Sequence, residues 1–235
     1  MRNAIGSLAV RHRTEWIMLS AVLGLVAFYY LTRADTIGVS SPARGWTAMT
    51  GASVAAWRHF VSAAVLLGLV PVSMAWLAGR SPRSVGLGLG RWREGLLWLA
   101  AGVPLAVVAG RIAAANPLMR AVYPLYPQHL DGTGLFAAYA ALQILYFGAW
   151  EVLFRGVLLF GTEDIVGPRP ANLFQTALSV TAHFGRALTE TFSALPAGLV
   201  FGAVALRTRS VWYTAIIHWT VAVSMDWFIM HGVCS

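Results

Sequence analysis

The sequence predicts an all-α fold, a polytopic bundle of about seven transmembrane helices with one segment a candidate for re-entrance. Composition is the first reason. Hydrophobic residues make up 58% of the 235 residues and charged residues only 11%, whereas a soluble domain carries about 45–50% apolar and about 25% charged residues. The mean hydropathy of +0.66 is the second reason. The third is that apolar stretches of about 20 residues, the length that crosses a bilayer as a helix, recur along the chain.

Seven apolar segments are the predicted spans. Helices are expected because lipid cannot satisfy exposed backbone groups, and because the runs are too long and too uniformly apolar for barrel strands. A single integral membrane domain, 1–235, is the simplest organisation. The segments cover about 16–32, 56–78, 95–115, 135–160, 171–184, 192–206 and 211–230.

Charge predicts how the chain sits in the membrane. All 17 basic residues are arginine, and the net charge is +8. This charge does not indicate a nucleic-acid partner, because basic loops of membrane proteins follow the positive-inside rule and contact anionic lipid headgroups. With a cytoplasmic N-terminus, ten arginines fall in inside loops and six lie outside. We therefore expect an integral protein of a bacterial cytoplasmic membrane with its N-terminus inside.

The fourth predicted span contains two charged residues. Glu151 and Arg155 are four positions apart, so they share a helix face and can pair. Insertion scales place the cost of each such charge at about 2.5–3.5 kcal/mol. An apolar pair of similar volume usually stabilises a core as well as a buried ion pair does, or better. Keeping an ion pair in this helix therefore indicates function.

Three further polar residues mark the later spans. His183 ends the fifth segment, His218 lies in the seventh, and Asp226 follows eight residues later. The depths of Glu151, His183 and His218 agree within roughly one and a half helical turns. We expect these three side chains to face one cavity that opens to the cytoplasm. Trp150, beside Glu151, is too deep to be an interfacial belt residue.

The order of these residues resembles a known family. Glu151-Val-Leu-Phe-Arg155-Gly156, then His183 and His218, is similar to the CAAX-protease and bacteriocin-processing (abortive-infection-like) family of glutamic-type intramembrane endopeptidases. That family's pattern is Glu-Glu-x-x-x-Arg, then Phe-x-x-x-His, then His-x-x-x-Asn. Here 32 residues lead from Glu151 to His183, and 35 more lead to His218. The resemblance covers about 85–228, the predicted protease-like core.

Three positions depart from the family pattern. Trp150 stands where the family has its first glutamate, Ser179 where it has phenylalanine, and Ala222 where it has asparagine. In the family, the first glutamate and the first histidine activate water, and the second histidine and the asparagine form the oxyanion site. The resemblance therefore does not supply a catalytic glutamate directly, and Ala222 has nothing to donate.

The resemblance implies roles for the residues that remain. His183 is expected to orient water, His218 to serve the oxyanion, and Arg155 to be the structural partner of a glutamate. Glu151 is the only carboxylate of the fourth span and is therefore the expected base. Asp226 is expected to fix the tautomer of His218 or to replace part of the missing asparagine.

The leading prediction is an intramembrane endopeptidase that cleaves a membrane-anchored protein or peptide with water activated by Glu and His, without a cofactor. One alternative is a catalytically degenerate member in which Trp150 blocks the water site, acting as an immunity, chaperone or scaffold protein. Another is a zinc peptidase with Glu151, His183 and His218 as ligands. The metal-free mechanism is preferred because the chain has no His-Glu-x-x-His motif. A transporter has little support, because no inverted repeat is evident.

Overall fold

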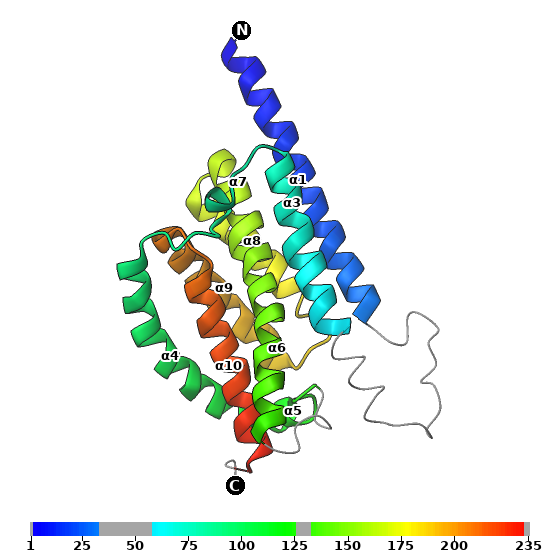
Figure 1. The fold of residues 1–235 in the computed structure, drawn as a ribbon, viewed down its shortest axis with the longest axis vertical. Coiled ribbons are helices and arrows are strands. Elements are labelled where there is room, and N and C mark those ends of the chain that lie inside the picture. Colours follow the sequence, from blue (N-terminus) through cyan, green and yellow to red (C-terminus); the bar gives the residue numbers. More distant parts are fainter. Residues whose placement is uncertain (1, 33–57, 126–132, 233–235) are drawn as a thin grey trace.

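The computed structural model describes residues 2–32, 58–125 and 133–232, and within these ranges the secondary structure is helical with no strand (Figure 1). This confirms the predicted all-α class. Arg33, Arg44 and Cys234 lie outside the described residues. The elements are α1 (Arg2–Thr32), η1 (Ala64–Leu69), α3 (Val70–Leu77), η2 (Pro82–Val85), α4 (Trp92–Ala115), α5 (Pro117–Arg120), α6 (Thr133–Glu151), η4 (Val152–Leu158), α7 (Leu159–Val166), α8 (Pro168–Thr181), α9 (Leu188–Thr208) and α10 (Trp212–Met230).

Each predicted apolar segment coincides with a helical pass. Five described helices are long and apolar enough to cross a membrane: Thr14–Leu31, Arg58–Leu77, Trp92–Ala115, Leu135–Val166 and Leu188–Thr208. The helix α10 adds a pass of 19 residues. The helix α8 has 14 residues, fewer than the roughly 20 that a full span needs. The re-entrance of one segment stays a prediction.

The fourth pass is the centre of the bundle. In the 18-residue window that qualifies it as a span, 72% of the residues are buried, against at most 28% in the corresponding windows of the other four. α6, η4 and α7 form one continuous helix whose middle, Val152–Leu158, is π-helical and completely buried. A π-helical segment inside an α-helix frequently marks a functional site. Glu151 and Arg155 lie at the start and in the middle of this irregular segment.

The arginine-rich loops gather at one end of the bundle, the end at which α1 begins (Figure 1). The Val211 amide donates to the Gly86 carbonyl at 3.0 Å. Arg80 pairs with Asp164 at 2.9 Å. These contacts join the loops before α4, between α7 and α8, and between α9 and α10. α5 lies at the opposite end.

Candidate active site

A cavity of about 530 Å³ lies among α4, α5, α6, α9, α10 and the end of α8. Its wall includes Trp150, Arg155, His183 and His218. It extends toward the α5 end, where Asn116, Met119 and Tyr123 line it. We expected a cavity opening on the same side as the basic loops. The structure corrects this, since the lining residues lead to the opposite end.

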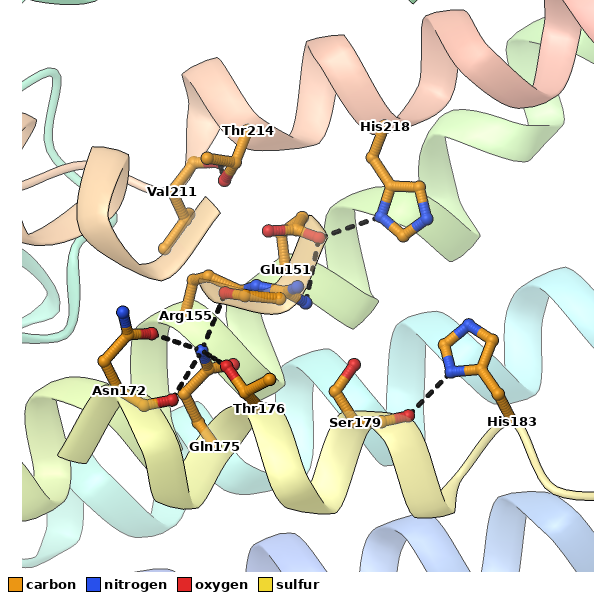
Figure 2. Close-up of polar contacts among 11 residues, drawn as sticks. Glu151, Arg155, Asn172, Gln175, Thr176, Ser179, His183, Val211, Thr214 and His218 are labelled. Carbon is orange, nitrogen blue, oxygen red and sulfur yellow. Dashed lines mark hydrogen bonds and ion pairs between the residues drawn. The ribbon is translucent and has the colours of Figure 1, made fainter. Parts of the chain in front are cut away.

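Glu151 is the hub of the buried polar contacts (Figure 2). Its Oε1 lies 3.1 Å from Nη1 of Arg155 and 2.8 Å from Nδ1 of His218. The Glu151 side chain is completely buried and the Arg155 side chain is 3% exposed. The ion pair that the spacing predicted is therefore formed, and it is extended to α10 through His218.

The contact between Glu151 and His218 sets the chemistry of the imidazole ring. A carboxylate at Nδ1 accepts the N–H there, so a neutral ring keeps its lone pair on Nε2. His218 lines the cavity, whereas Glu151 lies behind it and is absent from the wall. From the sequence, Glu151 was expected to orient water together with His183. Asp226 was expected to fix the tautomer of His218 or to replace part of the missing asparagine. The structure instead joins Glu151 to His218 and leaves the other two apart from this pair.

His183 faces the same cavity from the turn that follows α8. Its Nδ1 donates to the Ser179 carbonyl at 2.6 Å, which again leaves Nε2 with the lone pair. Figure 2 shows the His183 and His218 rings pointing into the space between α8 and α10. Two proton-accepting nitrogens therefore face one cavity.

Trp150 packs beside His183 rather than offering an acid. The two ring centres lie 5.3 Å apart at an interplanar angle of 78°. The indole is 4% exposed, and its Nε1 has no hydrogen-bond partner among the described residues. The position at which the family has its first glutamate is thus an aromatic wall of the cavity.

Asp226 lies deeper in α10 and makes a separate contact. Its Oδ2 accepts from Nε2 of Gln143 at 2.8 Å, a bond between α10 and α6. Both side chains line the cavity. Ala222 lines it too and offers only a methyl group. The structure therefore shows Asp226 in an interhelical bond to α6 and not in contact with His218.

The sequence analysis missed a second polar cluster in this cavity. The Tyr123 hydroxyl lies 2.9 Å from both carboxyl oxygens of Glu190, and Nη1 of Arg186 donates to it at 3.5 Å. All three residues line the cavity. Burial raises the pKa of Tyr123 well above its ordinary value, so this hydroxyl keeps its proton. Glu190 lies between two predicted segments, and only the actual start of α9 at Leu188 places it inside a helix.

The residues proposed as zinc ligands in the alternative prediction are poorly suited to bind a zinc ion. Within the described part of the chain, no group of three or more His, Cys, Asp or Glu residues could hold a metal ion. Oε1 of Glu151 already takes both His218 and Arg155, so direct coordination there would compete with a buried guanidinium. The expectation that the protein needs no cofactor stays a prediction.

Comparison with known proteins supports the resemblance that the motif suggested. The family model described as "Rce1-like: Type II CAAX prenyl endopeptidase Rce1-like" matches residues 132–224. This range contains Glu151, Arg155, His183 and His218. No curated protein and no solved structure gives a match. The predicted resemblance is confirmed over this segment.

Proposed function

We propose, on the premise that residues 132–224 form an Rce1-like core and that this family is one of proteases, that the protein is an intramembrane endopeptidase. Its substrate is a membrane-anchored protein or peptide, and the attacking water is activated by a Glu–His pair. The observation that carries this proposal is the 2.8 Å contact between buried Glu151 and His218 at the cavity wall.

His218 is the proposed general base. Nε2 accepts a proton from water as the water oxygen attacks the scissile carbonyl, and such a base contributes about 10²–10⁴-fold in rate. Glu151 holds Nδ1–H and stabilises the imidazolium that forms, as a carboxylate does behind a catalytic histidine. Nε2 of His183 accepts the second hydrogen of the water and so orients it. Arg155, in the cavity wall, favours the negative charge that develops on the carbonyl oxygen.

A degenerate protein without protease activity is the second candidate. Trp150 favours it, because the indole is buried against His183 where the family pattern has a glutamate. In that case Glu151, Arg155 and His218 hold the bundle together, and the protein acts as an immunity, chaperone or scaffold component in the membrane.

A cleavage assay in membranes separates the two functions. The substrates are a farnesylated peptide of the CAAX class and an unlipidated peptide that spans the bilayer. We expect the wild type to cleave at least one of them, and Glu151→Gln and His218→Ala to lower the rate by about 10²-fold or more. Glu163→Gln, at the surface pair with Arg209, is the matched control and keeps the wild-type rate. Cleavage that appears only with Trp150→Glu would establish the degenerate protein.

The proposed location is a bacterial cytoplasmic membrane with the N-terminus inside. The support is that Arg80, Arg83, Arg91 and Arg209 lie between helices, and Arg207 in the last turn of α9, at the end of the bundle where α1 begins. In this orientation the cavity extends toward the non-cytoplasmic side. The substrate then enters from the outer half of the bilayer.

A further inference from the structure

Peptide hydrolysis needs a proton donor for the leaving amine as well as a base for the attacking water. An amine leaves poorly as an anion, so a general acid must protonate the nitrogen as the C–N bond breaks. Glu151 is absent from the cavity wall, and Trp150 carries no acid. Among the described residues, the carboxyl groups that line the cavity are Glu190 and Asp226. The following inference rests on the proposed protease function and names its acid.

Glu190 suits the role better than Asp226. Asp226 is 2% exposed and accepts a hydrogen bond from Gln143, so it is a closed contact between α6 and α10. Glu190 is only partly buried and lies in the first turn of α9. Glu190 and His218 both line the cavity. Glu190 is thus a carboxyl group that faces the same space as the proposed base.

The first turn of α9, which contains Glu190, is tied to the turn that carries His183. The Thr191 hydroxyl donates to the His183 carbonyl at 3.0 Å, which ties the first turn of α9 to the turn that carries His183. The Tyr123 hydroxyl lies 2.9 Å from both oxygens of Glu190. A protonated hydroxyl in this position limits rotation of the carboxyl group. Glu190 is therefore held at the cavity wall.

We propose that Glu190 is the general acid of the reaction. Glu190 begins the cycle protonated. His218 takes one proton from water, and the hydroxide adds to the carbonyl carbon. Glu190 gives its proton to the amine nitrogen as the C–N bond breaks, which releases a carboxylic acid and an amine. Protonated His218 then returns its proton to the Glu190 carboxylate, and both groups regain their starting states.

A comparison of two leaving groups tests this role. The probes are the membrane-anchored peptide that the wild type cleaves and the same peptide with a thioester in place of the scissile amide. A thiolate, with an ordinary pKa of about 8.5, leaves without prior protonation. We expect Glu190→Gln to lower amide cleavage by about 10²–10⁴-fold and to change thioester cleavage by less than about threefold. Glu190→Asp, which keeps an acid, should retain part of the amide activity.

Each outcome decides between the possibilities. His218→Ala should lose both activities, because the base is needed for either leaving group. If Glu190→Gln loses amide and thioester cleavage equally, or keeps amide cleavage, Glu190 is not the acid although the protease proposal stands. If Glu190→Gln fails to accumulate in the membrane, the Glu190→Asp protein decides, and an amide-to-thioester ratio unchanged from wild type overturns the role. If the wild type cleaves neither probe, the protease function fails and the role of Glu190 fails with it.

Discussion

Glu151 is a fully buried carboxylate whose two partners reach the same oxygen. Arg155 approaches Oε1 at 3.1 Å and His218 at 2.8 Å. A buried pair usually adds little net stability compared with apolar residues of the same volume. Removing one partner is costly, because the other charge is left unpaired in a medium of low dielectric constant. The pair should therefore behave as a unit when it is mutated.

We expect Arg155→Met to lower the free energy of unfolding by about 3–5 kcal/mol, because it strands the carboxylate of Glu151. Adding Glu151→Gln to Arg155→Met should restore part of that loss, because the stranded charge is then gone. Thermal unfolding in detergent micelles, followed by tryptophan fluorescence, measures both changes. Arg207→Met, at the exposed pair with Glu94, is the control and should cost about 0–1 kcal/mol. Equal losses for Arg207→Met and Arg155→Met would contradict this account.

Single residues of the site differ in how far the sequence predicts them. The pairing of Glu151 with Arg155 follows from helix periodicity alone. The contact between Glu151 and His218 could not be predicted in this way. Two histidines of similar depth were candidates for the contact, and the sequence does not give the rotation of each helix about its axis. Glu190 was not predicted as a site residue, because it lies between two predicted apolar segments, although α9 begins before it.

At the scale of elements, apolar length predicts the passes well and their irregularities poorly. The fourth segment was expected to end near residue 160. Its helix continues to Val166, because a further, partly or fully exposed turn that contains Thr162, Glu163 and Asp164 follows the apolar stretch. The π-helical stretch Val152–Leu158 could not be predicted, because its residues are mostly apolar. Such a segment has no sequence pattern that distinguishes a π-helix from an α-helix. Both features depend on packing against neighbouring helices.

The contact between α8 and α9 holds the turn that carries His183. A Cβ on Gly202 would collide with Oδ1 of Asn172 and approach Nε2 of Gln175 at 2.7 Å. These two side chains are themselves hydrogen-bonded at 2.7 Å (Figure 2). Nδ2 of Asn172 donates to the Leu199 carbonyl at 3.0 Å. The absence of a side chain at Gly202 thus permits the polar network that joins the helices.

We expect Gly202→Ala to lower the free energy of unfolding by about 1–3 kcal/mol, because overpacking pushes α8 from α9. Cleavage should fall too, since His183 moves with the end of α8. Thermal unfolding and the membrane cleavage assay measure the two effects. Gly148→Ala is the matched helical control, because a Cβ there meets nothing within 4 Å; it should be neutral or stabilise by up to about 1 kcal/mol. Equal unfolding temperatures for the two variants would show that the α8–α9 contact tolerates a side chain.

The whole molecule has two dissimilar ends. Arginine-rich loops and the surface pairs Arg80–Asp164 and Arg209–Glu163 occupy one end. The cavity, with Tyr123 and Arg186 in its wall, extends toward the other. The positive-inside rule acts on the arginine-rich end. The side of the membrane from which a substrate reaches His218 therefore depends on this one asymmetry, and it can be measured without knowing the substrate.

Cysteine labelling decides the orientation, because the chain contains a single cysteine, Cys234, that can first be changed to serine. One single-cysteine protein then carries Val122→Cys, near the cavity mouth, and the other carries Leu89→Cys, in the loop before α4; both positions are exposed. With the N-terminus in the cytoplasm, a membrane-impermeant maleimide added to intact cells should label Val122→Cys and should reach Leu89→Cys only after permeabilisation. The reverse pattern would place the cavity mouth on the cytoplasmic side. Substrates would then come from the inner half of the bilayer, and the ten-to-six distribution of arginines would not have set the topology.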